Sequence, residues 1–311
     1  MRHPRRLRFG LQVADAASGD EWAAIARRAE DLGFDSLLLP DHFGAQLAPI
    51  PAMTAAALAT TELKVGALVF DNDYKHPVVL AKELATIDRL SGGRLEIGLG
   101  AGWMLTDYEQ AGMAYDPGPV RVDRFEEGLA IIKGLLGPDP VTFEGEHYQV
   151  TGLAGHPQPV DGVPPIIVGG GMKRMLTIAG READIVGINP TMPNGAADAD
   201  AARTGTATET DRKLGWVRDA AGDRYDALEI NLLNLSCLVT DDREQVASGL
   251  GPMFGLTAAE LLEFPHVYLG TVDQICDSIH ARRERWDASY LVVQADALDA
   301  MAPVVARLRG T

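Results

Sequence analysis

Short apolar runs alternate with amphipathic stretches along the N-terminal third of the chain. Four of these runs predict strands, because each is short and bounded by polar residues or glycine. They cover residues 7–13, 36–39, 63–70 and 94–99. In the first amphipathic stretch, Ser18 and Glu21 form a capping box and Gly33 marks the end of the predicted helix. Strands that alternate with helices in this way predict a parallel sheet with right-handed crossovers.

The second half of the chain keeps this alternation, with longer interruptions. Its predicted strands cover residues 166–168, 184–188, 229–239 and 290–293. Eight strands, each followed by helical material, favour a closed (β/α)8 barrel of the TIM type. The competing fold, an open doubly wound sheet, usually has a glycine fingerprint after its first strand, and the segment VADAASGDEW has none. We therefore expect one α/β barrel domain over residues 1–311.

Three long segments interrupt the barrel pattern, and in a barrel they would lie over the C-terminal mouth as lids. They cover residues 103–163, 190–228 and 241–270. The first holds a helix pattern and then VTFEGEHYQV, which predicts a short hairpin. The third holds a capping box at Thr257 and Glu260.

Charge and cysteine content narrow the class of protein. The formal net charge is -16, which argues against nucleic acid or an anionic membrane as a partner. Cys237 and Cys276 are the two cysteines, and so sparse a pair in a long chain predicts reduced thiols in the cytoplasm. No apolar run is long enough for a membrane span. We expect a cytoplasmic protein that acts on a small molecule.

Two polar segments follow predicted strands, where barrel enzymes place their catalytic groups. In Pro40-Asp41-His42, the histidine could transfer a proton near neutral pH and Asp41 could orient it, or His42 could simply cap a loop. The sequence weighs these two interpretations equally. In the second segment Asp71, Asp73 and His76 could bind a metal, but their spacing matches no strong motif and Lys75 lies among them. A solvated loop is the better interpretation there.

Two glycine-rich turns also follow predicted strands. Gly98 to Trp103 could let the backbone approach a flat ligand, or could simply form a tight corner. Gly169 to Gly171 lead into a predicted helix that begins with Lys173 and Arg174. Free backbone N–H groups at a helix start, with added positive charge, favour a phosphate site over a plain turn.

Taken together, these segments resemble the luciferase-like monooxygenase superfamily. The resemblance rests on LGFDSLLLPDH (32–42), HPVVLAKELATIDRLSGGRLEIGLGAGW (76–103), VRVDRFEEGLAIIKGLL (120–136), VTFEGEHYQV (141–150), PPIIVGGGMKRMLTIAGREADIVG (164–187) and YLGTVDQI (268–275). It runs almost from end to end. Within the superfamily the chain looks most like the branch that depends on the deazaflavin coenzyme F420.

The resemblance implies a role for each matching position. Asp41 and His42 would contact the deazaflavin ring and act in proton transfer. A non-proline cis peptide would lie behind the ring, at Ala67-Leu68 or one bond later. Further cofactor contacts would come from Ala67, Leu68, Val69, Trp103, Thr106, Val168, Gly169, Gly170, Gly171, Lys173 and Arg174. Asn189 would meet the substrate or the cofactor tail. Phe70 and Asn72 depart from the family pattern and would line the substrate site after the third strand.

One departure concerns the catalytic acid. Some deazaflavin enzymes carry a glutamate just after the GxG turn, where this chain has Trp103 to Thr106. The first acid is Asp107, so the resemblance does not predict an acid role for Asp107 or Glu109.

Four functions follow as hypotheses. The first is hydride transfer between F420 and a small organic substrate, with the cofactor supplying the difficult chemistry. The alternative is a monooxygenase that uses reduced FMN from a separate reductase. A metal-dependent hydrolase built on the loop at 71–76, and a barrel that binds without turnover, are less favoured. The resemblance also implies a homodimer.

Overall fold

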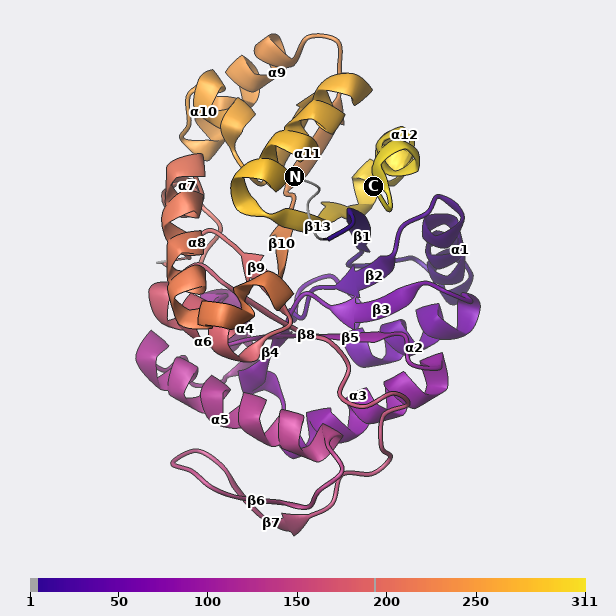
Figure 1. Cartoon of the computed structure of the whole chain (residues 1–311), viewed down its shortest axis with the longest axis vertical. Coiled ribbons are helices and arrows are strands. Elements are labelled where there is room, and N and C mark those ends of the chain that lie inside the picture. Colours follow the sequence, from indigo (N-terminus) through magenta and orange to yellow (C-terminus); the bar gives the residue numbers. More distant parts are fainter. Residues whose placement is uncertain (1–4, 193) are drawn as a thin grey trace. The chain divides into compact units, whose positions relative to one another are not determined.

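The structure is a computed structural model that describes residues 5–192 and 194–311, and Figure 1 labels its helices and strands. The strands pair in the order β3-β2-β1-β13-β10-β9-β8-β5-β4, and β3 also pairs with β5. Both β3 and β4 pair with β5, so these two short strands share one position and the nine strands close into a ring of eight, which confirms the (β/α)8 barrel. The barrel strands are β1 (Arg8–Gln12), β2 (Ser36–Leu39), β3 (Lys64–Ala67), β4 (Phe70–Asp71), β5 (Leu95–Gly100), β8 (Ile166–Gly170), β9 (Ile185–Ile188), β10 (Glu229–Leu233) and β13 (Ala288–Gln294).

Helices follow the strands and are capped largely as the sequence predicts. They are α1 (Gly19–Asp31), α2 (Pro49–Ala59), α3 (Pro77–Ser91), α4 (Leu105–Ala111), α5 (Gly118–Leu136), α6 (Lys173–Glu182), α7 (Ala199–Arg203), α8 (Ala207–Ala221), α9 (Arg243–Leu250), α10 (Ala258–Glu263), α11 (Val272–Trp286) and α12 (Leu298–Leu308). The predicted capping box at Thr257 is present at α10. Among the described residues, no helix is long and apolar enough to cross a membrane.

Two of the predicted strands are each divided in two, which corrects their sequence-based bounds. The run at 63–70 forms β3 and β4, with Leu68 and Val69 between them. The run at 229–239 forms β10 and β11 (Ser236–Val239), and β11 pairs with β12 (Val267–Gly270) instead of with the barrel. The first run is continuously apolar across its break and the second alternates across its break. Neither pattern reveals which partner a strand has. The predicted hairpin is confirmed as β6 (Val141–Glu144) and β7 (Gln149–Leu153).

The chain divides into two compact units. Unit 1 consists of Met1–Val13, Arg28–Ser36 and Val168–Thr311. Unit 2 consists of Ala14–Arg27 and Leu37–Ile167. The expectation of a single domain over residues 1–311 stays a prediction.

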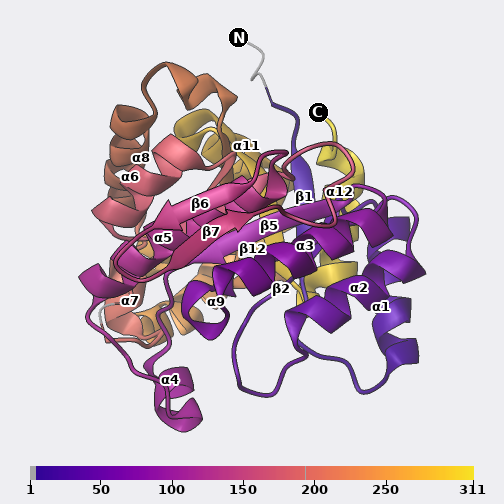
Figure 2. The ribbon, with the colours of Figure 1, turned by 90° about the horizontal axis from the view of Figure 1, so that it is seen from below.

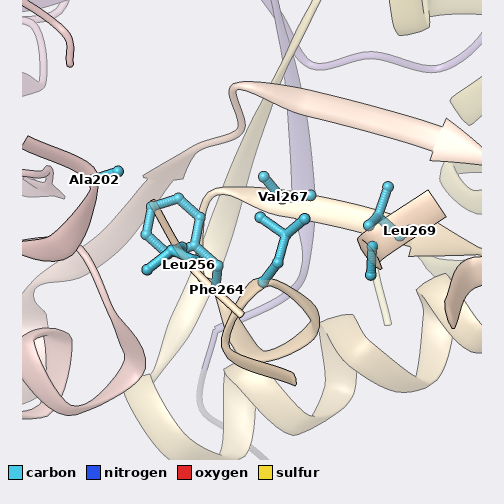
Figure 3. Packing of buried hydrophobic residues seen from close by; sticks show 7 residues of the cluster. Ala202, Leu256, Phe264, Val267 and Leu269 are labelled. Carbon is cyan, nitrogen blue, oxygen red and sulfur yellow. The ribbon is translucent and has the colours of Figure 1, made fainter. Parts of the chain in front are cut away.

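In unit 1, the insertion at 241–270 has an apolar core of its own. Leu261 and Phe264 are fully buried there, and Val267 is almost fully buried beside them. Figure 3 shows Leu256, Phe264 and Val267 gathered between the short helices and β12. Side chains buried to this degree each contribute about 1.5–3 kcal/mol to folding. This insertion is therefore a well-packed part of unit 1. Its role as a lid stays a prediction.

In unit 2, helices α2 and α3 pack side by side, and the β6–β7 hairpin lies along α5 (Figures 1 and 2). One carboxylate of α5, that of Glu127, holds the hairpin turn. It accepts hydrogen bonds from the backbone N–H groups of Glu146, His147 and Tyr148, at 2.8, 3.0 and 2.9 Å. The hairpin is thus fixed to the helix by charge-assisted hydrogen bonds.

Close packing makes Gly128 of α5 sensitive to substitution. A Cβ at position 128 would lie 2.1 Å from Oδ1 of Asn72, whose side chain is 2% exposed and cannot move aside freely. We expect Gly128→Ala to lower the free energy of unfolding by about 1–3 kcal/mol. The matched control is Gly215→Ala in α8, where a Cβ meets nothing within 4 Å. It should raise stability by about 0.5–1 kcal/mol because alanine favours the helix. Urea denaturation of both variants checks the pair, and equal effects would contradict it.

Candidate functional site

The site in unit 2 begins where β2 ends. All four residues of β2 are buried, so the chain emerges from the core directly into Pro40-Asp41-His42. Nδ1 of His42 lies 2.7 Å from Oδ2 of Asp107, the third residue of α4. The His42 side chain is 20% exposed and the Asp107 side chain 6%. A partly accessible imidazole is therefore held by an almost buried carboxylate.

Two further donors converge on Asp107. The hydroxyl of Tyr74 donates to Oδ2 at 2.9 Å, and the backbone N–H of Phe43 donates to Oδ1 at 3.3 Å. A carboxylate with these donors acts as an acceptor, so we assign the Nδ1 proton of His42 to the bond with Asp107. In the neutral imidazole, Nε2 then carries the lone pair. The arrangement leaves His42 able to accept a proton at Nε2.

Trp103 lies against the other side of His42. Their ring centroids are 5.3 Å apart and the rings are nearly perpendicular, at 86°. The hydroxyl of Tyr115 donates to the carbonyl of Trp103 at 3.0 Å. Arg121, almost buried, donates to the carbonyls of Ala101 and Gly102 and stacks on the Tyr115 ring, 4.2 Å from its centroid. The start of α5 therefore fixes the segment that carries Trp103.

A second group of carboxylates lies beside His42. The backbone N–H of Asp71 donates to Oδ2 of Asp41 at 3.2 Å, and the hydroxyl of Tyr108 donates to Asp71 and Asp73, at 3.0 Å each. Burial raises the pKa of Asp71 to about 7, against the hydrogen bond from the Asp73 N–H. Burial also raises the pKa of Asp41, although the Asp71 N–H and the charge of Lys75 oppose the shift.

The raised pKa of Asp71 gives a stability prediction. The pKa lies near 3.8 in the unfolded chain and at about 7 in the fold, so folding takes up a proton in that window. Stability at this site is greatest below pH 4 and falls as the pH rises to 7, by at most about 4 kcal/mol at about 1.4 kcal/mol per pKa unit. We expect Asp71→Asn to flatten this fall relative to the wild type. The measurement is urea denaturation at pH 5 and pH 8, with the exposed Asp223→Asn as control. An unchanged pH slope in Asp71→Asn would contradict the prediction.

The loop at 71–76 is buried at its start and exposed at His76, so the expectation of a solvated loop is wrong for Asp71 and Asn72. Asp71 and Asn72 are 8% and 2% exposed, and Arg124 of α5 forms an ion pair with Asp73 at 2.7 Å. Asp71 and Asn72 are buried because Tyr108 of α4 contacts Asp71 and Gly128 of α5 packs against Asn72. His76 instead caps α3 by accepting from the N–H of Val78. Within the described part of the chain, no three His, Cys, Asp or Glu side chains are grouped so that they could hold a metal ion.

The break between β3 and β4 holds the cis peptide, at Leu68-Val69. This is the second of the two bonds that the sequence predicts. Close packing against this break accounts for two glycines of β5, Gly98 and Gly100. A Cβ at Gly98 would lie 1.9 Å from the carbonyl oxygen of Ala67, and one at Gly100 would lie 2.7 Å from Cγ2 of Val69. Both glycines are therefore required by the close approach of β5 to the segment with the cis peptide, and the approach of a flat ligand to this turn stays a prediction.

The glycine turn after β8 belongs to unit 1. The N–H of Asn189 donates to the carbonyl of Gly170 at 2.9 Å, and a Cβ at Gly171 would lie 2.5 Å from the carbonyl oxygen of Pro190. Lys213 of α8 is almost fully buried and donates to the carbonyl of Asn189 at 2.7 Å. Burial lowers the pKa of Lys213 to about 8. Hydrogen bonds with Gly170 and Lys213 thus hold the segment that contains Asn189.

The helix that follows this turn is open to an anion at its start. Met172, the N-cap of α6, provides no side-chain hydrogen bond to the first turn, and Lys173 and Arg174 are exposed there. Backbone N–H groups without a side-chain cap, beside positive charge, suit a phosphate.

The structure brings Asp41, His42 and Trp103 together in unit 2, with Ala67 to Val69 in the same unit. Val168 to Gly171, Asn189, Lys173 and Arg174 belong to unit 1. Thr106 is exposed on α4, whereas Phe70 and Asn72 are buried. Asn72 donates to the hydroxyl of Tyr148 at 3.3 Å. The ligand contacts of all these residues stay predictions.

Sequence reasoning missed Asp107, Tyr74 and Arg121. The one available signal was the position of Asp107, three residues into a helix that follows a glycine turn. It could not show that the carboxylate reaches back to His42, 65 positions earlier.

Comparison with known proteins gives the family of this chain. The family described as luciferase-like monooxygenase matches residues 7–306. This chain belongs to the luciferase-like monooxygenase family. It is 31% identical over 254 residues to an F420-dependent glucose-6-phosphate dehydrogenase of Nakamurella multipartita, covering 78% of this chain and 70% of that protein.

Relatives of the family use more than one cofactor. The chain is 29% identical over 186 residues to an FMNH(2)-dependent dimethylsulfone monooxygenase of Pseudomonas fluorescens, covering 56% of this chain and 50% of that protein. The chain thus spans half the length of that relative. Its fold matches a coenzyme F420 dependent tetrahydromethanopterin reductase of Methanopyrus kandleri, with a TM-score of 0.76, 18% identity, and 98% and 100% of the two chains covered.

Proposed function

We propose that this luciferase-like protein transfers a hydride between coenzyme F420 and a small organic substrate. The observation that carries the proposal is the His42–Asp107 pair, with its 2.7 Å hydrogen bond at the end of β2. Hydride transfer to or from an oxygen-bearing carbon requires a proton acceptor or donor at that oxygen. The 31% identity to an F420-dependent relative supports the choice of cofactor.

The residues present fit an anionic cofactor. The first turn of α6 has no side-chain cap, and Lys173 and Arg174 lie at its start. Together with the Gly169 to Gly171 backbone, they would hold a phosphate group. Ala67 to Val69 and Trp103 would line the ring. When bound, reduced F420 supplies the hydride, or oxidised F420 accepts it.

The chain's own residues handle the proton. In alcohol oxidation, Nε2 of His42 would accept the hydroxyl proton as the hydride leaves carbon. Asp107 would hold the ring by Nδ1 and stabilise the imidazolium, as a buried carboxylate does in a histidine-carboxylate pair. In carbonyl reduction the protonated His42 would return the proton. Trp103 and Tyr74 would exclude water beside the ring, which strengthens electrostatic interactions there.

A second candidate is an FMN-dependent monooxygenase that receives reduced flavin from a separate reductase. The 29% identity to an FMNH(2)-dependent relative favours it. The phosphate-binding groups would serve FMN equally well. In this case His42 would lie near the flavin without a required proton-transfer step.

A cofactor titration separates the two candidates. The purified protein is titrated with F420, FMN and NADPH while tryptophan fluorescence is recorded, because Trp103 would lie near the ring. We expect quenching by F420 at micromolar concentration, and hydride transfer to follow by the change in F420 absorbance. Tight binding of FMN without binding of F420 would overturn the proposal. The control is Trp286→Phe, which removes a buried tryptophan of unit 1 and should leave the quenching in place.

Assembly and location are also proposals. We infer a homodimer in the cytoplasm, on the family resemblance and on the two reduced cysteines, which are both free and buried. Light scattering of the purified protein measures the mass against the 33.3 kDa of one chain.

A further inference from the structure

A buried cation of unit 1 lies behind the loop that follows β9. Lys213 of α8 is 1% exposed, and its ammonium donates to the backbone carbonyls of Asn189 and Thr204 at 2.7 Å each. Among the residues that the structure describes, none forms an ion pair with it. Removing a charge from water is costly, and a methionine would fill the same space without that cost. The position therefore points to a role for the two hydrogen bonds.

The two carbonyls belong to the two ends of that loop. Asn189 directly follows β9, and Thr204 is the C-cap of α7. In a barrel, the segment after a strand lies at the mouth where ligands bind. The ammonium of a lysine has three donors, so one side chain can hold carbonyls of both segments. Burial lowers the pKa of Lys213 to about 8, and the charged form still predominates at pH 7. Lys213 therefore closes the loop at its base.

Hydrogen bonds continue from this loop to the glycine turn after β8. The hydroxyl of Thr204 accepts from the N–H of Thr191 at 2.6 Å. The hydroxyl of Thr191 in turn donates to the carbonyl of Gly171 at 3.0 Å. At the other end of the loop, the N–H of Asn189 donates to the carbonyl of Gly170 at 2.9 Å. The loop that Lys213 closes thus holds two successive carbonyls of the turn.

The loop and the turn are also in direct van der Waals contact. A Cβ at Gly171 would lie 2.5 Å from the carbonyl oxygen of Pro190 and 2.7 Å from that of Asn189. A Cβ at Gly205, just after Thr204, would lie 2.8 Å from Cγ of Pro190. Close-packed groups transmit a displacement to their neighbours. A shift of the loop would therefore shift the backbone of the turn.

We infer that Lys213 is a positioning residue for the phosphate end of the cofactor site. The inference rests on the proposed function, which assigns the Gly169 to Gly171 backbone to the phosphate. Lys213 is almost fully buried, so it acts through Asn189 and Thr204 and does not contact the ligand. Backbone N–H groups hold a phosphate only when they point at it, because a hydrogen bond weakens steeply as its angle falls. Loss of the ammonium would release the loop and let the turn shift.

Ligands with and without the phosphate test the inference on the full chain. FMN is compared with riboflavin, and F420 with 8-hydroxy-5-deazariboflavin, which lacks the phosphate and the tail beyond it. Fluorescence titration gives the dissociation constants. We expect Lys213→Met to raise the dissociation constant of the phosphate-bearing ligand by at least about tenfold, and that of its phosphate-free counterpart by less than about twofold. At saturating F420, kcat should stay within about threefold of the wild type, because Lys213 does not contact the reacting atoms.

The other outcomes count against the inference and separate it from the proposed function. Equal weakening of both members of a pair means a general structural defect, and unchanged affinity for the phosphate-bearing member means that Lys213 does not position the turn. If the wild type binds FMN and not F420, the proposed function fails, and FMN with riboflavin still tests Lys213. A wild type that gains no affinity from the phosphate overturns the inference alone. Binding of none of the four ligands overturns both.

A pair of threonine variants tests the hydrogen bonds between the loop and the turn with the lysine left in place. Thr204→Val keeps the shape and removes the hydroxyl that accepts from the N–H of Thr191, whereas Thr204→Ser keeps the hydroxyl. We expect Thr204→Val to weaken binding of the phosphate-bearing ligand by at least about fivefold, and Thr204→Ser by less than about twofold. Equal effects of the two variants would refute the inference. This pair decides the matter if Lys213→Met does not fold.

Val305→Ala is the control for lost stability. Val305 of α12 is fully buried in unit 1, and the cavity left by alanine lowers stability without removing a hydrogen bond. We expect its affinity for both members of each pair to stay within about twofold of the wild type. A selective loss of the phosphate-bearing ligand as large as in Lys213→Met would mean that lost stability alone explains the effect, and would overturn the inference.

Discussion

Replacing His42 with alanine is expected to lower kcat of F420-coupled turnover by about 10²- to 10⁴-fold, the usual contribution of a positioned general acid or base. The reason is that Nε2 of His42 is the proton-handling atom that Asp107 leaves free at the end of β2. The measurement is steady-state turnover with F420 and the best alcohol substrate. The matched control is His280→Ala on the exposed face of α11, which should keep full activity.

This loss should be confined to the chemical step. His42 is partly exposed and its ring does not fill the core, so the variant should fold and keep its affinity for F420 within a few-fold. Full kcat in His42→Ala would remove this residue from the proposed mechanism. A loss of F420 binding with unchanged kcat at saturation would instead assign His42 to the cofactor contact alone.

Replacing Asp107 with asparagine is expected to lower kcat by about 10- to 10³-fold, because the neutral amide stabilises the imidazolium less and permits the wrong tautomer of His42. In the wild type the two carboxylate oxygens accept hydrogen bonds from His42, Tyr74 and Phe43. Asparagine has only one side-chain oxygen to accept them. We expect KM to change less than about threefold, since Asp107 is a positioning residue that acts through His42.

Two further variants separate this role from a structural one. Asp107→Glu keeps the charge and should recover part of the lost kcat. Asp116→Asn removes a carboxylate that pairs with Arg124 and has no bond to His42, so its kcat should stay within about threefold of the wild type. Equal losses in Asp107→Asn and Asp116→Asn would indicate that the whole carboxylate group matters only for folding.

Much of the barrel could be predicted from local pattern. Short apolar runs located the eight strands, and the capping box at Thr257 and Glu260 marked the start of α10. These features depend on neighbours in the sequence. The position of Asp41 and His42 could also be predicted locally, because the first polar residues after a buried strand lie at the end of that strand.

The contacts that make the site depend on residues far apart in the sequence. Arg124 covers Asp73 from 51 positions away, and Tyr74 reaches Asp107 from 33. The partial burial of the loop at 71–76 follows from contacts of this kind, and no local pattern indicates it. For the same reason the sequence predicted one strand at 229–239, although β11 finds its partner in β12.

The attachment of the hairpin turn by Glu127 has a consequence for engineering. The carboxylate contacts only main-chain N–H groups, so the turn is recognised without regard to the side chains at 146 and 147. Those two positions can accept labels, cysteines or charged residues while the turn keeps its place. Proline is the exception, because it would remove one of the three donors. A spectroscopic probe at 147 would sit next to Tyr148, the partner of Asn72, and would report on that buried contact from the surface.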